Sequence, residues 1–369
     1  MSRVQLGDVA IEHKENCKED KTMYPIVGLE HLTPEQITLQ NWDLNTENTF
    51  TKVFRKGNVL FGRRRAYLKK AAVAPFDGIC SGDITVIEAK EDKIIPELLP
   101  FVIQNDDLFD FAVGKSAGSL SPRVKWTHLQ NYEFELPTKE KQRELAKALW
   151  AIEDTRKSYQ ELIKRTDELV KSQFIELFYG KGYPVKNIGD VIDKNIIRVG
   201  KVFEKTDLIQ YLDISSIDNT SKTVIGLTPY ALADAPSRAQ YVLKQNDIMY
   251  STVRPNLQNF AINPYSDENV VGSTGFCVLR CIGVTTGYMW GVINSIPFTE
   301  AMVNQASGAN YPAVTDKVVH AYEIPIPPEN EQNAYDELVR QSDKSKFELN
   351  RALDELTATY KQIIKDNLG

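Results

Sequence analysis

The sequence repeats itself, and this repeat constrains the fold more than any other feature of the chain. Residues 118–142 align without a gap onto residues 308–332, with glycine, proline, tyrosine and glutamine at matching positions. The other matched segments are 6–9 with 188–191, 58–61 with 247–250, 65–68 with 254–257, and 81–82 with 274–275. The matches keep their order in both halves, so we expect two copies of one structural unit. A chain of 369 residues also exceeds the usual size of a single core.

Each half follows the same internal plan. Short β-prone runs broken by Gly, Pro, Asn and Asp come first, at 58–61 and 84–87 in one half and at 247–253 and 275–280 in the other. A proline-bearing bridge follows, at 135–138 and 324–328, and proline is favoured where a helix begins. The sequence therefore predicts that a β-rich unit leads into a helix twice.

The two stretches after the bridges, 138–179 and 329–368, contain neither proline nor glycine. Helices of this length would extend about 60 Å at roughly 1.5 Å per residue. Their apolar residues recur every three or four positions, which is typical of a seam between two helices. The predicted seam residues are Leu145, Leu149, Ile152, Tyr159, Ile163, Val170, Leu177, Leu338, Leu349, Ala352, Leu356 and Ile363. An antiparallel pair is expected; two separate surface helices, each packed on its own domain, remain the alternative.

Cysteine and histidine usage gives no sign of a metal site. The cysteines are Cys17, Cys80, Cys277 and Cys281, and the histidines are His13, His31, His128 and His320. No CxxC pair occurs and no zinc spacing is completed, so reduced, buried thiols are expected. No apolar run reaches the roughly 18 residues that a membrane span needs, and the first residues lack a signal-peptide core. We expect a cytoplasmic protein without a cofactor.

The net charge of −6 hides a basic segment. Residues 48–76 contain no acidic side chain but hold eight basic ones, namely Lys52, Arg55, Lys56, Arg63, Arg64, Arg65, Lys69 and Lys70. Binding to DNA depends on local potential more than on total charge. This segment predicts a surface that binds nucleic acid.

Motifs for chemistry on DNA are incomplete. An adenine methyltransferase needs an Asn/Asp-Pro-Pro-aromatic loop for the extruded base, and the nearest matches, 263–265 and 326–329, each depart from it. Gly114, Lys115 and Ser116 resemble the end of a phosphate-binding loop, but its first glycine would fall on Phe109. We therefore expect a non-catalytic DNA-binding protein; a DNA methyltransferase or nuclease, and a coiled-coil scaffold that binds no DNA, remain the alternatives.

The chain resembles the specificity subunits of type I restriction–modification systems. The segments that carry the resemblance are 57–67 (GNVLFGRRRAY), 77–83 (DGICSGD), 132–142 (YEFELPTKEKQ) and its recurrence 322–332 (YEIPIPPENEQ). The resemblance covers nearly the whole chain in the order domain, helix, domain, helix. The second half departs from the first in lacking the arginine triplet and in having extra prolines in its bridge; the first departure suits domains that read different sequences.

The resemblance implies an α+β fold with two tandem α/β target-recognition domains, two long antiparallel helices as a coiled-coil spacer, and a pseudo-two-fold repeat. The implied segments are domain 1 at 1–137, a central helix at 138–181, domain 2 at 182–327 and a C-terminal helix at 328–369. Such a protein would read a split, asymmetric target on double-stranded DNA. Its implied partners are methyltransferase subunits, with two expected, and a restriction and translocation subunit as a further candidate.

Each domain offers candidate DNA-contacting residues. Arginine pairs with guanine, amide side chains pair with adenine, and lysine mostly holds phosphate. In domain 1 the candidates are Arg63, Arg64, Arg65, Tyr67, Lys69, Lys70, Lys115, Ser116, Ser119 and Arg123. In domain 2 they are Thr252, Arg254, Asn256, Gln258, Asn259, Asn304, Gln305, Asn310 and Tyr311. The opposing interpretation is that these are ordinary solvated loops.

Overall fold

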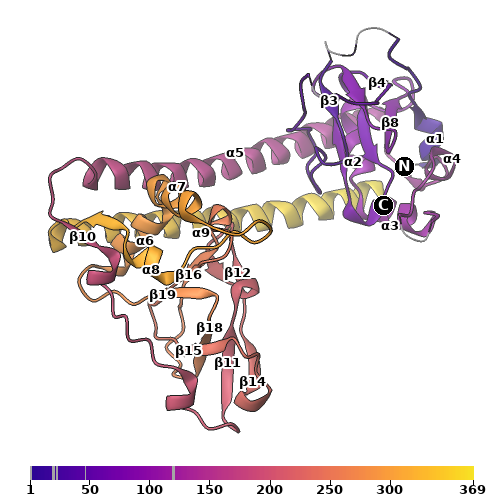
Figure 1. The fold of residues 1–369 in the computed structure, drawn as a ribbon. Coiled ribbons are helices and arrows are strands. Elements are labelled where there is room, and N and C mark those ends of the chain that lie inside the picture. The colour runs from indigo at the N-terminus through magenta and orange to yellow at the C-terminus, as the bar shows by residue number, and fades with distance from the viewer. Residues whose placement is uncertain (1, 19–20, 22–23, 46, 119–120) are drawn as a thin grey trace. The chain divides into compact units, whose positions relative to one another are not determined.

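The chain forms two compact units of mixed helix and strand (Figure 1). The computed structural model describes residues 2–18, 21, 24–45, 47–118 and 121–369. Unit 1 comprises Met1–Glu161 and Leu349–Gly369, and unit 2 comprises Leu162–Glu348. The mixed composition agrees with the predicted fold class. Each unit includes part of both long helices, because the boundaries between the units fall within these helices.

Unit 1 holds two small sheets covered by short helices. The four-stranded sheet has the order β2 (Ala10–Glu12), β8 (Ile84–Ala89), β5 (Val59–Gly62), β6 (Ala71–Val73), all antiparallel. The three-stranded sheet has the order β3 (Ile26–Val27), β7 (Gly78–Cys80), β4 (Lys52–Phe54), with β3 parallel to β7. The helices are α1 (Leu6–Val9), α2 (Leu99–Ile103), α3 (Asp106–Gly114) and α4 (Trp126–Leu129), with the 3-10 turns η2 (Ala66–Leu68) and η3 (Pro96–Leu98). The main core lies where β5 meets α2 and α3, with Phe61 stacked on Phe109.

Unit 2 repeats this plan with an extended sheet. The strand order β17 (Phe260–Ile262), β16 (Ile248–Ser251), β19 (Phe276–Leu279) forms one sheet. A second sheet has the order β14 (Thr228–Ala231), β11 (Leu208–Leu212), β18 (Val270–Ser273), β15 (Ala239–Val242), and β12 (Ile217–Asp218) pairs with β13 (Thr223–Val224). The helices are α6 (Thr286–Asn294), α7 (Ile296–Gln305) and α8 (Asp316–His320), with the 3-10 turns η4 (Ile188–Asp190), η5 (Val199–Lys201), η6 (Ile214–Ser216), η7 (Leu232–Asp234) and η8 (Pro255–Leu257).

The same joint connects the β-rich part of each unit to its long helix. A two-stranded ribbon closes each unit, formed by β1 (Ser2–Gln5) with β9 (Glu133–Leu136) and by β10 (Val185–Asn187) with β20 (Glu323–Pro325). Just beyond it, the buried side chain of Gln142 donates to the carbonyl of Pro137 at 2.8 Å and accepts from the N–H of Ile95 at 2.9 Å. Gln332 makes the equivalent bonds, at the same distances, to Pro327 and Thr285. The repeat in the sequence is thus a repeat in structure.

The long helices are α5 (Lys139–Phe178) and α9 (Glu329–Leu368), each unbroken from one unit into the other (Figure 1). In unit 2, Asp167 on α5 accepts from Lys346 on α9 at 2.7 Å, and the rings of Phe174 and Tyr335 lie 5.2 Å apart. From the first of these contacts to the second, the residue number rises on α5 and falls on α9, so these segments run antiparallel. In unit 1, the Arg156 guanidinium of α5 lies 5.8 Å from the ring centroid of Tyr360 on α9.

The predicted seam residues differ in how deeply the structure buries them. Leu145 and Leu149 are buried, and Ile152, Ile363, Val170 and Leu338 pack against the cores of the units. Tyr159, Ile163, Leu349, Ala352 and Leu356 are half-buried. Leu177 is 40% exposed, whereas Phe174 and Phe178 are buried in the core of unit 2. Phe174 packs against Tyr288 and Gly291 of α6, and Leu177 lies to the side of the face that Phe174 and Phe178 bury.

Candidate nucleic-acid interface

A tight turn follows the central strand β5 of unit 1, and residues 63–70 in and around it include most of the basic candidates of this unit. Arg65 and Lys69 flank η2 with left-handed backbone, at φ 54° and 50°. The N–H of Arg65 donates to the carbonyl of Pro122 at 2.9 Å, and Ala66 is buried in the core. These two anchors leave Tyr67 at the tip of the turn, 55% exposed.

Unit 2 builds the same turn from different side chains. Arg254 and Gln258 flank η8 with φ 51° and 49°, and the N–H of Arg254 donates to the carbonyl of Pro312 at 2.7 Å. Pro255 is buried, and Leu257 is 44% exposed. We call these segments, residues 65–69 and 254–258, the recognition turns. Their common backbone presents different side chains.

A second loop supports each recognition turn. Its two sides exchange a pair of backbone hydrogen bonds, between Ala117 and Arg123 at 3.0 and 2.9 Å and between Ser307 and Ala313 at the same distances. Gly118 and Gly308 lie in this loop at φ 113° and 112°, a conformation that glycine adopts without steric cost. Ser119, predicted to contact DNA from this loop, lies outside the described residues.

An acidic side chain organises the arginines of unit 1. Asp83 accepts from Arg123 through both carboxylate oxygens, at 2.7 and 3.3 Å, and lies 3.6 Å from the guanidinium of Arg64. The hydrogen bond from Arg123 is the main reason that the pKa of Asp83 lies below its usual value. Arg64 also donates to the hydroxyl of Ser121 at 2.5 Å. Asp83 therefore holds Arg64 and Arg123 side by side and offsets part of their positive charge.

Sequence reasoning assigned no role to Asp83. The available signals were its position immediately after the matched segment 81–82 and its place at the end of the segment 77–83 (DGICSGD) that carries the family resemblance.

The remaining basic candidates of unit 1 differ in where their side chains go. Arg65 is exposed, and none of the described residues forms an ion pair or side-chain hydrogen bond with it in the structure. The Nε of Arg63 is buried without a hydrogen-bond partner among the described residues. Lys69 donates to Asp106 at 2.5 Å, and Lys70 donates to the carbonyl of Leu29 at 2.8 Å. Arg65, together with exposed Tyr67, is thus the side chain best placed to meet a ligand.

Two candidates next to the second loop of unit 1, Lys115 and Ser116, contact residues of the preceding helix α3. The Lys115 ammonium lies 5.6 Å from the ring centroid of Phe111, and the Ser116 hydroxyl donates to the carbonyl of Ala112 at 2.8 Å. Lys115 is exposed and stays a candidate for phosphate contact.

In unit 2, an arginine–tyrosine stack dominates the exposed surface of the turn. The Arg254 guanidinium lies 4.6 Å from the ring centroid of Tyr311, which is 69% exposed, and donates to the carbonyl of Asn310 at 3.3 Å. Asn256 is exposed at the tip of the turn. The Arg254 guanidinium therefore lies against an exposed ring and is itself exposed, and arginine held on an aromatic ring is suited to recognising carboxylate, phosphate or nucleic acid.

The other polar candidates of unit 2 mostly bond within the protein. Gln258 donates to the hydroxyl of Thr299 at 2.8 Å, and Thr252 donates to the carbonyl of Gly275 at 3.2 Å. Asn259 is half-buried. Asn304 and Gln305 are the exposed last residues of α7. Their contact with DNA stays a prediction.

Replacing Asp83 with asparagine is expected to release Arg64 and Arg123 toward DNA. Affinity for unrelated duplex should rise severalfold at low salt, because the released arginines can contact phosphates. Each added phosphate contact should also steepen the dependence of log K on log salt by about 0.9. The measurement is a salt titration of binding to a labelled random duplex. Asp77→Asn is the matched control, since Asp77 pairs with Arg55 at 3.0 Å instead of with the arginines around Asp83. Equal salt slopes for the two variants would contradict this role of Asp83.

The described residues hold no group of three or more His, Cys, Asp or Glu side chains arranged for a metal ion. Burial raises the pKa of Cys80 to about 12, and that of Cys281 to about 12.

Among the helices that the structure describes, a search for one both long and apolar enough to span a bilayer finds none.

Comparison with known proteins finds a family model that matches the N-terminal part of the chain. The family model for the type I restriction modification DNA specificity domain matches residues 2–165. Over 132 residues the chain is 26% identical to the specificity subunit of the type I restriction enzyme EcoDI from Escherichia coli. That alignment spans 35% of this chain and 29% of the relative.

Solved structures resemble the chain over its full length. One, from work on complex assembly and conformational transition of the type I R-M system, has a TM-score of 0.58 at 20% identity, covering 99% of this chain and 97% of the other. Another is the S subunit of a type I restriction–modification system from M. genitalium, with a TM-score of 0.57 at 11% identity, covering 100% and 96%. At these identities the likeness concerns the fold.

Proposed function

We propose that this chain, whose residues 2–165 match the model of the type I restriction modification DNA specificity domain, reads a split DNA sequence as the specificity subunit of a type I restriction–modification complex. Unit 1 would read one half of the target and unit 2 the other. Its role would be recognition without catalysis, carried out in the cytoplasm on double-stranded DNA.

One observation carries this proposal: the same turn is built twice, on the same backbone, with different exposed side chains. Arg65 and Arg254 occupy equivalent left-handed positions, but their neighbours Tyr67 and Asn256 differ. Two turns with the same backbone and different exposed side chains are suited to binding two half-sites of different sequence. The target should therefore not be a palindrome. Guanidinium groups are suited to guanine in the major groove and to phosphate.

The partners in this proposal are methyltransferase subunits, two in number, and a restriction and translocation subunit. The relative from Escherichia coli is a specificity subunit of a restriction enzyme, which supports such an assembly. The long helices α5 and α9 would serve as spacer and as docking surface, since α5 exposes Leu162 and Leu169 to solvent.

The proposal is tested by mapping methylated adenines after the chain is co-expressed with the methyltransferase subunit of its own system. A split, asymmetric motif is the expected result, and selection of tight binders from a randomised duplex library should yield the same two half-sites. Methylation without a split motif, together with no enrichment in the selection, would overturn the proposal.

Replacing either equivalent arginine should damage one half-site only. Arg65→Ala should weaken binding to the selected duplex by about 1–3 kcal/mol and relax sequence preference in half-site 1. Arg254→Ala should do the same in half-site 2. Arg143→Ala, which removes an exposed arginine from α5, is the control and should leave both half-sites unchanged. The measurement is library selection followed by titration of labelled duplexes. Loss spread evenly over both halves would show that the arginines hold phosphate only.

A further inference from the structure

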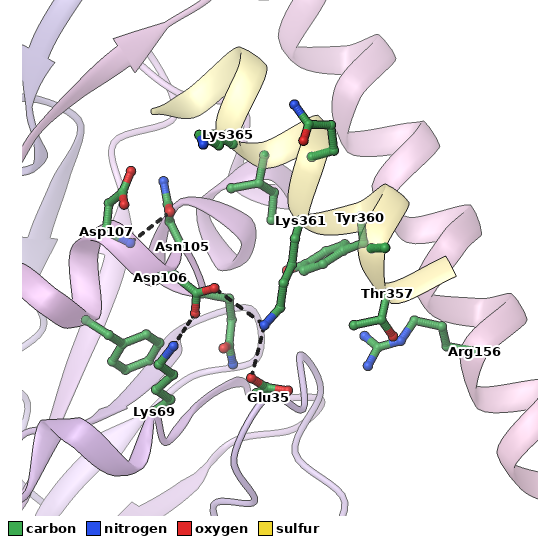
Figure 2. A pocket seen from close by; sticks show the side chains of 15 residues that line it. Glu35, Lys69, Asn105, Asp106, Asp107, Arg156, Thr357, Tyr360, Lys361 and Lys365 are labelled. Carbon is green, nitrogen blue, oxygen red and sulfur yellow. Dashed lines mark hydrogen bonds and ion pairs between the residues drawn. The ribbon is translucent and has the colours of Figure 1, made fainter. Parts of the chain in front are cut away.

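A closed ring of four charged residues joins the recognition turn of unit 1 to the C-terminal part of α9. The Lys69 ammonium donates to Asp106 at 2.5 Å, and Asp106 lies 3.4 Å from the Lys361 ammonium of α9. Lys361 also donates to Glu35 at 3.3 Å (Figure 2). The ring closes through the backbone, because the N–H of Glu35 donates to the carbonyl of Lys69 at 3.4 Å. All four residues belong to unit 1.

The ring holds two strained stretches of backbone. Lys69 has φ 50° and Glu35 has φ 60°, although neither is a glycine. Left-handed backbone costs such residues roughly 1–2 kcal/mol each, so other contacts must hold both positions. The lysine that ends the recognition turn thus has its charge engaged within the protein, although the sequence suggested that it contacts DNA.

Lys361 is firmly placed because the end of α9 is part of the core of unit 1. Tyr360, Ile364 and Leu368 are buried there. Asn105, which caps the start of α3 by accepting from the N–H of Asp107 at 3.1 Å, also donates to the carbonyl of Leu368 at 3.2 Å. A movement of this end of α9 therefore acts on the ring and on the first turn of α3 together.

Unit 2 fastens its recognition turn differently: the Lys222 ammonium donates to the backbone carbonyl of Gln258, and none of the described residues forms an ion pair with the turn. The residue equivalent to Lys69 is Gln258, which hydrogen-bonds to the hydroxyl of Thr299 on α7. The two turns thus have the same backbone but different attachments, and in unit 1 the attachment includes α9.

We propose that the ring formed by Glu35, Lys69, Asp106 and Lys361 is a positioning device through which the C-terminal part of α9 sets the recognition turn of unit 1, and so the sequence read in half-site 1. This inference rests on the proposed function and deepens it. Lys69 and Lys361 act here as positioning residues; the DNA contacts come from Arg65 and Tyr67 on the turn that the ring holds.

The experiment uses the full chain and a randomised duplex library. Wild type, Lys361→Met, Lys361→Arg and Lys365→Met are each selected against the library, and their affinities are then measured on duplexes with either half-site intact. Lys365 is the matched control, because it lies one turn further along α9 beside the same pocket and, among the described residues, forms no ion pair.

Lys361→Met should lose sequence preference in half-site 1 and bind it about fivefold more weakly, the size expected of a partly exposed ion-pair network. Half-site 2 should be bound within twofold of wild type, which also shows that the variant is folded. Lys361→Arg should restore half-site 1, and Lys365→Met should match wild type.

The inference is overturned if Lys361→Met selects the wild-type motif, or if it weakens both half-sites equally with a shallower salt slope, since a phosphate contact would behave in that way. If wild type itself selects no split motif, the proposed function fails instead, so the two failures are distinguishable.

Discussion

Replacing Phe174 with alanine is expected to destabilise unit 2 by about 3–5 kcal/mol, the usual cost of removing a buried aromatic side chain. Phe174 is 1% exposed, and its ring lies 5.2 Å from that of Phe178 and 5.5 Å from that of Tyr288. Gly291 of α6 approaches so closely that a Cβ there would lie 2.5 Å from the ring of Phe174. The cavity left by alanine could not be filled from the side of α6. Gly291 has no side chain that could move into the cavity, and its backbone is fixed in the helix.

The change is measured by hydrogen exchange across the full chain, which reports on each unit separately. Strands β16 and β19 of unit 2 should lose protection, whereas β5 and β8 of unit 1 should keep theirs. Leu177→Ala is the control and should cost less than about 1 kcal/mol, as expected of a surface position. If Leu177→Ala were as damaging as Phe174→Ala, the seam residue predicted from spacing would be correct and the buried aromatic register would be wrong.

Shortening both long helices together should shorten the spacer between the two half-sites of the recognised target. Removing seven residues from α5 and seven from the facing stretch of α9 shortens each helix by about 10.5 Å, at roughly 1.5 Å per residue. Seven residues are close to two helical turns, so the faces that pack stay nearly aligned. Because both helices run from one unit into the other, the spacer between the half-sites should shorten by about three base pairs, at roughly 3.4 Å each.

Methylation mapping in the co-expression system provides the measurement. The expected motif keeps both half-sites and has a shorter gap, with the original sites no longer methylated. Removing seven residues from α5 alone serves as control and should abolish methylation, because the antiparallel contacts, such as Asp167 with Lys346, lose register. Retention of the original gap by the doubly shortened chain would show that the helices do not set it.

The repeat was the most informative part of the sequence. Matching 65–68 with 254–257 helped to predict two copies of one structural unit, and the absence of proline and glycine predicted helices that the structure places at Lys139–Phe178 and Glu329–Leu368. Both features are local or periodic, so the order of residues along the chain reveals them.

Side-chain partners from distant segments were beyond that reasoning. Asp83 meets Arg123, forty positions away, and Lys361 meets Glu35 across 326 positions. No spacing rule predicts such pairs, so lysines and arginines that balance nearby carboxylates were interpreted as free to bind DNA. The left-handed backbone at Arg65 and Lys69 was equally hidden, because neither residue is a glycine or asparagine.

The placement of the end of α9 within the core of unit 1 has a consequence for synthesis. Proteins leave the ribosome from the N-terminus, and N-terminal domains generally fold first. Here Tyr360, Ile364 and Leu368 are needed to cover apolar side chains such as Phe101 and Leu149. Unit 1 therefore cannot bury its full core until the residues of α9 have been synthesised. Before that point its nascent form exposes apolar side chains, which are the kind of surface that chaperones bind.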